Sequence, residues 1–109
     1  MSPRVSQPKS EIGGLGRFSE PALLILAALA AGSKHGYAII QDIELESGQR
    51  LGPGTLYGAI ARLGFIEPLV MGDRGRRPYR ITAAGQKAFQ DRMNDLVQYQ
   101  ALLNTLAAR

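Results

Sequence analysis

The chain has 109 residues, a formal net charge of +4 and no cysteine. This length fits one domain, and the lack of cysteine excludes disulfides and thiolate metal sites. A single histidine, His35, leaves no cluster for zinc, so we expect no metal or other cofactor. The moderate basic charge favours a polyanionic partner, although many small domains carry as much charge.

Residues 1–18 are expected to form a flexible arm ahead of the folded domain. The stretch MSPRVSQPKSEIGGLGR holds two prolines, three glycines and three serines but few apolar residues. Such a composition favours an unstructured lead over part of a core. Its basic residues would suit a DNA minor groove, although an untethered terminus explains the composition as well.

The apolar run ALLILAALAA at 22–31 superficially resembles the centre of a signal peptide. However, Glu11 and Glu20 interrupt the positive region that a signal peptide would need. Ser19, Glu20 and Pro21 are typical of a helix start, with a capping serine, an early acid and an early proline. The run is also about half the length that spans a bilayer. We therefore expect a buried helix here, no membrane partner and a cytoplasmic protein.

Three helices are predicted in the first part of the chain. The first covers about 21–31, the second runs from Lys34 or His35 to Gly48, and the third covers about 53–63. The second and third helices carry inward apolar residues at helical spacing, namely Ile39, Ile40 and Ile43, then Leu56, Ile60 and Leu63.

Two short apolar runs, 66–71 and 79–82, flank a turn rich in glycine and arginine and predict a β-hairpin. Pro68 shortens the first strand or places it at an edge. Thr82 is suited to cap a last helix that runs to the end of the sequence. The expected fold class is mostly α with a small β-hairpin wing: a winged helix-turn-helix over 19–82, followed by a long C-terminal dimerisation helix over 83–109.

The stretch GPGTLYG at 52–58 at first resembles a loop that cradles phosphate. Its glycine spacing differs from the dinucleotide-binding pattern, no strand precedes it in a βαβ unit, and no Gly-Lys-Ser/Thr ending follows. One histidine, no cysteine and scattered carboxylates leave no pair of nucleophile and base. The sequence therefore does not predict an enzyme.

The third helix lies in a window without acidic residues, because no Asp or Glu occurs between Glu46 and Glu67. A helix that approaches phosphates is expected to avoid outward carboxylates. Small residues on its outer face would let the backbone lie close to a DNA groove, or would merely allow helix–helix packing. The residues expected to face outward are Gly54, Thr55, Tyr57, Gly58, Ala61 and Arg62.

Two further positions suit phosphate contacts. Lys34 and His35 place a cation beside the free N–H groups expected at the start of the second helix. Alternatively, His35 packs in a turn. The wing at 72–80 would either contact DNA or remain a charged, solvated turn. Against one acid, Asp73, it carries Arg74, Arg76, Arg77 and Arg80.

Three segments together resemble the PadR family of transcriptional regulators. They are HGYAIIQDIE (35–44), PGTLYGAIARL (53–63) and GRRPYRITAAG (75–85), and the resemblance covers about residues 20–90. It implies a homodimeric bacterial repressor with a winged helix-turn-helix and a dimerising C-terminal helix. It also implies release from DNA by a small apolar or phenolic effector, as in many family members.

On this resemblance, the P-G-T-L-Y helix would lie in the major groove and the basic wing on flanking DNA. Tyr37 and Tyr79 would pack within the domain. After Arg62 and Leu63, the family's usual link to the wing is shorter here by about three residues, which puts helix length and wing placement in question. The residues implied at the DNA are Pro53, Gly54, Thr55 and Tyr57 in the groove, with Arg76 and Arg77 in the wing.

The last helix carries a seam of apolar residues with a repeat of about 3.5, which indicates a helical partner. Alternatively, this helix folds back on its own domain.

The sequence also leaves open a second function, in which the winged helix dimerises and binds other proteins without reading DNA. The predicted dimer contacts are Phe89, Met93, Leu96, Tyr99, Leu103 and Leu106, with Gln100 and Ala107 in the same repeat.

Overall fold

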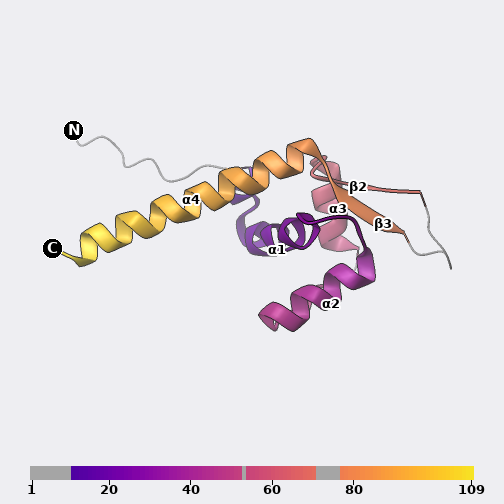
Figure 1. The fold of residues 1–109 in the computed structure, drawn as a ribbon, viewed down its shortest axis with the longest axis horizontal. Coiled ribbons are helices and arrows are strands. Elements are labelled where there is room, and N and C mark those ends of the chain that lie inside the picture. Colours follow the sequence, from indigo (N-terminus) through magenta and orange to yellow (C-terminus); the bar gives the residue numbers. More distant parts are fainter. Residues whose placement is uncertain (1–10, 53, 71–76) are drawn as a thin grey trace.

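A computed structural model describes residues 11–52, 54–70 and 77–109 (Figure 1). Over these residues the chain is mostly helical, with a small antiparallel sheet, as predicted. The molecule is elongated, 59 × 26 × 22 Å, because the last helix extends away from the other elements. In chain order the elements are the 3₁₀ helix η1 (Gly13–Phe18), α1 (Ser19–Leu29), β1 (Lys34–His35), α2 (Gly36–Ser47), α3 (Thr55–Arg62), β2 (Ile66–Pro68), β3 (Pro78–Ile81) and α4 (Ala83–Ala107).

The core forms around α1, which is apolar almost all round. Ala22, Ile25, Leu26 and Leu29 are spaced so that they share one face of the helix, and all four are buried. The predicted inner face of α2 is confirmed, since Ile39 and Ile43 are buried and Ile40 packs against the same core. Helix α1 starts two residues before its predicted start, with Phe18 at the N-cap position, so the expected serine cap is absent.

Residues 11–18 belong to the folded body, so the prediction of an arm over 1–18 is wrong for this part. Ile12 is fully buried, and Leu15 and Phe18 pack against the core. The composition of the segment concealed these three contacts, because glycines and a charged residue separate its apolar side chains. The rest of the predicted arm, 1–10, lies outside the described residues.

The sheet has the order β1-β3-β2 among the described residues, with both pairings antiparallel. The predicted hairpin is therefore present, and β1 adds a strand that the sequence did not predict. Lys34 pairs with Tyr79 and His35 with Pro78. Helix α2 begins only at Gly36, and it ends as predicted where Gly48 adopts the left-handed conformation with φ of 76°.

The shortened link after α3 is closed by a Schellman turn. The amide of Gly64 donates to the carbonyl of Ala61 over 2.9 Å, and the amide of Phe65 donates to the carbonyl of Ile60 over 3.3 Å. Ile60 and Phe65 are both buried, which supplies the apolar contact typical of this motif. As a result α3 ends at Arg62, and Leu63, predicted to point to the core, is 44% exposed.

Helix α4 starts at the predicted cap. The hydroxyl oxygen of Thr82 accepts a hydrogen bond from the amide of Gly85 over 3.0 Å, and the same hydroxyl donates to the carbonyl of Gly64. The amide of Thr82 donates to the carbonyl of Phe65 over 3.0 Å. The end of α3 and the start of α4 therefore meet at one junction. Within the described parts of the chain, none of the helices combines the length and apolar character needed to cross a membrane.

Candidate nucleic-acid interface

Tyr57 fixes α3 to the sheet and to the start of α2. Its hydroxyl donates a hydrogen bond to the carbonyl of Gly36 over 3.0 Å, and its ring stacks on Tyr79 with centroids 5.5 Å apart. Only 8% of Tyr57 is exposed, so the prediction that it faces outward is wrong. Burial raises the pKa of its phenol to about 12. The predicted internal packing of Tyr79 is confirmed, whereas Tyr37 is largely exposed.

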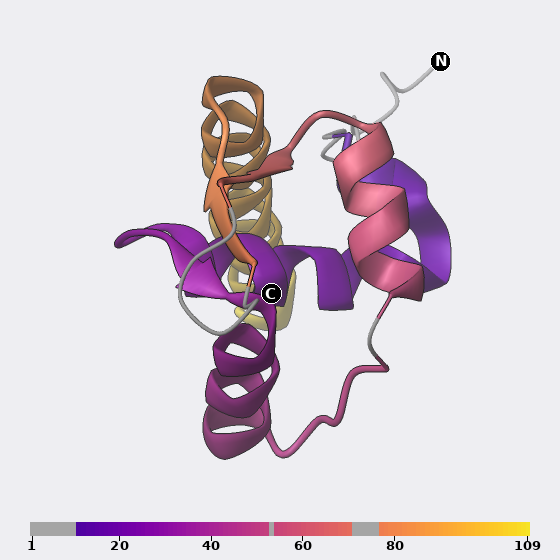
Figure 2. The ribbon, with the colours of Figure 1, turned by 90° about the vertical axis from the view of Figure 1, so that its right-hand side faces the viewer.

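The remaining surface of α3 is small or basic. Gly54, Ala61 and Arg62 are exposed, and Gly58 is half-buried. No residue of α3 carries a carboxylate, and the nearest acids in the sequence are Glu46 and Glu67. Figure 2 shows α3 at the outer edge of the body. This arrangement leaves one side of α3 open to a polyanion.

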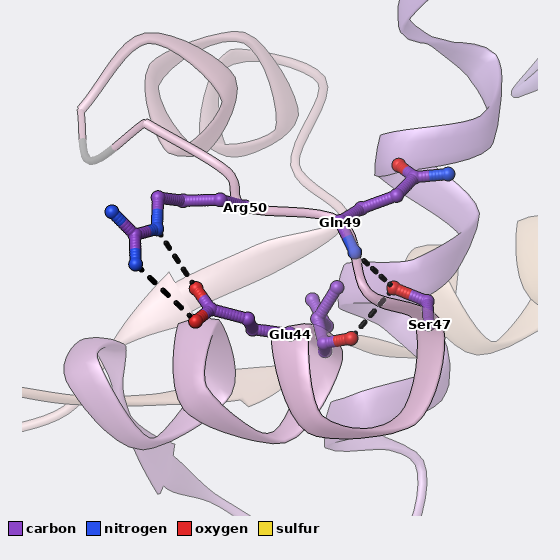
Figure 3. Close-up of polar contacts among 5 residues, drawn as sticks. Glu44, Ser47, Gln49 and Arg50 are labelled. Carbon is purple, nitrogen blue, oxygen red and sulfur yellow. Dashed lines mark hydrogen bonds and ion pairs between the residues drawn. The ribbon is translucent and has the colours of Figure 1, made fainter.

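Two predicted site residues near α3 are not described in full. Pro53 lies outside the described residues, and the structure gives the backbone of Thr55 but not its side chain. Between α2 and α3, the connecting loop carries Arg50. Its guanidinium donates to both carboxylate oxygens of Glu44, over 3.0 and 3.4 Å (Figure 3). These hydrogen bonds, together with the charge of Arg50, hold the pKa of Glu44 below its usual value.

Ser47 completes the end of α2. Its hydroxyl donates to the carbonyl of Ile43 over 2.6 Å and accepts from the amide of Gln49 over 3.1 Å (Figure 3). This network sets the direction in which the chain leaves α2 towards α3.

Lys34 and His35 do not form the helical start expected of them. Both lie in β1, and the ammonium of Lys34 donates to Asp42 of α2 over 2.5 Å. The Nδ1 atom of His35 is buried and has no hydrogen-bond partner among the described residues. The positive charge of Lys34 is thus already paired within the domain, and His35 lies in a strand next to the start of α2 and not in a turn.

Of the four wing arginines, Arg77 and Arg80 are described and exposed, whereas Arg74 and Arg76 lie outside the described residues. Arg80 pairs with Glu67, its direct partner in the register of β2 and β3. In the sequence Arg80 belongs to the predicted basic turn, and its pair with Glu67 was not predicted. The hairpin register would have revealed it, since oppositely charged residues often face each other across strands.

The predicted seam of α4 is largely uncovered in the monomer. Phe89 packs against the core, whereas the next five seam residues expose between 40% and 58% of their surface. Figure 1 shows why, since α4 extends past α1 and none of the other described elements lies along its C-terminal half. The alternative that α4 folds back on its own domain therefore does not hold for the exposed seam. The exposed seam consists of Met93, Leu96, Tyr99, Leu103 and Leu106.

Together these elements define a winged helix-turn-helix protein of the DNA-binding type. Helices α1, α2 and α3 surround one core, a hairpin follows, and α3 presents an acid-free surface. No group of three or more His, Cys, Asp or Glu that could hold a metal occurs within the described ranges.

Comparison with known proteins narrows this class. Residues 25–91 match the PadR-like family of transcriptional regulators, and the chain belongs to that family. It is therefore a DNA-binding transcriptional regulator, a kind of protein that is generally not an enzyme. Family members bind DNA and are often dimeric.

Individual relatives agree with this assignment. A transcriptional regulator from Clostridium thermocellum is 28% identical, with a TM-score of 0.64 over 77% of this chain and 86% of that one. A PadR family regulator from Clostridium difficile shares the fold at 19% identity, with a TM-score of 0.66 over 79% of this chain and 96% of that one.

A curated relative comes from Streptomyces fradiae. It is an uncharacterized 37.1 kDa protein in transposon TN4556, 47% identical over 78 residues, or 68% of this chain. The chain spans only 22% of the length of that protein.

Proposed function

We propose that this regulator is a homodimeric, cytoplasmic repressor that reads a palindromic operator. In each subunit α3 lies in the major groove, while the wing at 72–80 lies on flanking DNA. A small-molecule effector releases the protein from its operator. Lys34, His35 and Tyr57 are left out of the proposed contacts because the domain itself occupies their polar groups or buries them. The proposed DNA contacts are Pro53, Gly54, Thr55, Gly58, Arg62, Arg74, Arg76 and Arg77.

The observation that carries the proposal is that α3 carries no acidic residue of its own and exposes small and basic residues. A carboxylate on α3 would repel phosphates, and a bulky side chain would hold the backbone away from base edges. Gly54, Ala61 and Arg62 present neither obstacle, and Arg62 adds a cation at the end of the helix.

The exposed seam of α4 supports the dimer. Five apolar residues in one row lose their contact with water when two copies pair, and a twofold pair uses the same surface on both. In such a dimer two α3 helices would lie about one DNA turn apart, roughly 34 Å, as palindromic half-sites require.

A DNA titration at several salt concentrations tests the function. Fluorescence anisotropy with the DNA upstream of the protein's own gene should show tight binding that weakens steeply with salt. Substitution Arg77→Ala should lower the slope of log K against log salt by about one, since one phosphate contact is lost. Lys87→Ala is the matched control, because Lys87 lies on α4 and pairs with Asp91. Absence of salt-dependent binding to that DNA would refute the proposal and favour the protein-binding alternative.

A further inference from the structure

Two charged side chains of α4, Arg92 and Asp95, have no partner within the described part of the chain. The Nε atom of Arg92 and the Oδ2 atom of Asp95 are buried, and neither takes part in a hydrogen bond. None of the ion pairs among the described residues includes either side chain, although the two lie only three residues apart. A buried polar atom without a partner costs free energy, and a charged group costs most. In a single copy of the chain both charges are therefore unsatisfied.

Arg92 and Asp95 lie on the face of α4 that carries the exposed seam. Counted from Arg92, four of the seam residues follow at intervals of four, three, four and three, the spacing that keeps side chains on one face of a helix. Asp95 borders the same face, four residues before Tyr99. A second copy that covers the seam therefore also covers both charges. The row that begins at Arg92 continues with Leu96, Tyr99, Leu103 and Leu106.

The opposite signs of the two charges make this face complementary to itself. A twofold axis that brings one residue of the first copy to a second residue of its partner also brings the second residue of the first copy to the first residue of the partner. An axis that places Arg92 opposite Asp95 of the partner subunit therefore forms two identical ion pairs at once. A surface of a single sign would satisfy one of the two residues and leave the other unpaired. This pattern fits a second copy of the chain.

We propose that Arg92 of one subunit pairs with Asp95 of the partner subunit, and that these two reciprocal ion pairs determine which chains dimerise. The inference rests on the proposed dimer and adds the contact that selects the partner. A polar contact inside an apolar seam is satisfied in one alignment of the helices, so it also fixes their register. A chain whose seam lacks the opposite charges leaves buried charges unpaired, which disfavours mixed dimers with other regulators.

The reciprocal pairs also define how the two α4 helices cross. Residue 92 lies directly opposite residue 95 of the partner when the helices run antiparallel and the axis passes between residues 93 and 94. In a parallel pair, identical residues lie level with each other, so Arg92 would face a second arginine. The proposed crossing is nearer to the start of α4 than to its end. The C-terminal half of α4, which has none of the other described elements beside it in Figure 1, then extends past the crossing towards the partner's domain.

Charge reversal at each position tests the pair. Arg92→Glu places two acids opposite each other at both contacts, and Asp95→Arg places two bases there. Each single variant should raise the dimer dissociation constant by at least about a hundredfold. A mixture of the two variants brings opposite charges together again at both contacts, so a heterodimer should form with an affinity within about tenfold of the parent dimer. Native mass spectrometry counts the heterodimer and the two homodimers in such a mixture.

Lys87→Glu and Asp91→Arg are the matched controls, because they make the same changes of charge on α4 at two residues that already pair with each other. Both should leave the dissociation constant within about fivefold of the parent value. The double variant Arg92→Glu/Asp95→Arg restores opposite charges at both contacts and should dimerise with itself, which separates loss of pairing from loss of folding. A mixture of the single variants that forms no heterodimer would overturn the proposal.

Distances between spin labels test the crossing independently. The chain has no cysteine, so one introduced cysteine carries the only label in each subunit. Asn94→Cys and Asn104→Cys are a matched pair, since both asparagines are exposed on α4 and they differ in distance from the proposed crossing. In the dimer, the two labels at 104 should lie about 30 Å apart along the helices, and the two labels at 94 should lie closer together. Equal distances or the reverse order would overturn the proposed alignment.

The proposed dimer and the reciprocal pairs fail in different ways. A parent protein that is monomeric at every concentration tested would refute the dimer, and the pairs with it. A parent dimer whose dissociation constant is unchanged by both single reversals would refute the pairs and leave the dimer in place.

Discussion

The backbone carbonyl of Phe65 occupies the place where a side chain on Gly85 would begin. A Cβ on Gly85 would lie far inside van der Waals distance of this carbonyl oxygen, 2.9 Å from the carbonyl carbon and 2.8 Å from Cγ1 of Ile81. Gly85 is buried in the first turn of α4, where its amide donates to Thr82. The approach of α4 to the end of α3 therefore depends on the absence of a side chain at this position.

We expect Gly85→Ala to lower the free energy of unfolding by about 2–3 kcal/mol, because the backbones at the junction must move apart. Chemical denaturation followed by circular dichroism measures this change. Gly52→Ala is the matched control, since a Cβ there meets nothing within 4 Å, and it should be nearly neutral. A stability equal to that of the parent protein would show that the junction can relax.

Tyr57→Phe should keep the ring stacked on Tyr79 but remove the hydrogen bond to the carbonyl of Gly36. The expected cost is about 1 kcal/mol of unfolding free energy. Tyr99→Phe on the exposed seam of α4 is the control and should cost little in the monomer.

The same phenol predicts a dependence on alkaline pH. Its pKa is raised from 10.0 to about 12 in the folded protein, so the folded state holds its proton where the unfolded state has lost it. The contribution of Tyr57 to stability is therefore intact below pH 10 and declines as the pH rises from 10 towards 12. An ultraviolet titration should show a phenol that ionises at about 12 in the parent protein and is missing from Tyr57→Phe. If both proteins ionise identically, the ring is not buried as described.

Replacement of Leu96 and Leu103 by Gln should dissociate the proposed dimer. Each leucine buries its side chain twice in a twofold interface, and full burial of one is worth about 1.5–3 kcal/mol. The dimer dissociation constant should therefore rise by at least about a hundredfold. Sedimentation equilibrium measures it, and Gln98→Ala, away from the seam, should leave it unchanged. A parent protein that stays monomeric at every concentration tested would contradict the prediction.

Glu67→Gln should strengthen DNA binding. Arg80 now pairs with Glu67 across the hairpin, and removal of the carboxylate frees its guanidinium and eliminates a negative charge beside the wing. The slope of log K against log salt should become steeper by up to about one. Asp91→Asn frees Lys87 on α4 and serves as the control. Equal effects of both variants on DNA affinity would indicate a response to net charge alone.

The fold class could be predicted from local patterns, whereas several contacts of individual residues could not. The spacing of Ile39 and Ile43 was enough to identify the inner face of α2, because helical period and burial coincide there. Burial of Tyr57 depends on Tyr79, twenty-two residues away, which no period within α3 reveals. A strand of two residues, such as β1, is likewise too short to show alternation.

For the candidate interface, the charge of α3 could be predicted from the sequence, whereas the ion pairs of the nearby cations could not. The acid-free character of α3 is a property of the sequence itself and holds in the structure. The pair of Arg80 with Glu67 depends on the strand register, and the pair of Lys34 with Asp42 depends on how α2 packs beside β1. The number of basic residues in the sequence is therefore larger than the number of unpaired cations at the interface.

The junction at Thr82 also determines the direction in which α4 leaves the rest of the domain. Helix α4 has 25 residues and is about 37 Å long, so a small rotation at its first turn displaces its far end by many times the movement at the junction. In a dimer joined along α4, the separation of the two α3 helices would follow any such rotation. The hydrogen bonds from Thr82 to Gly64 and Phe65 hold the start of α4 in place. They would therefore limit the distances between operator half-sites that the dimer can bind.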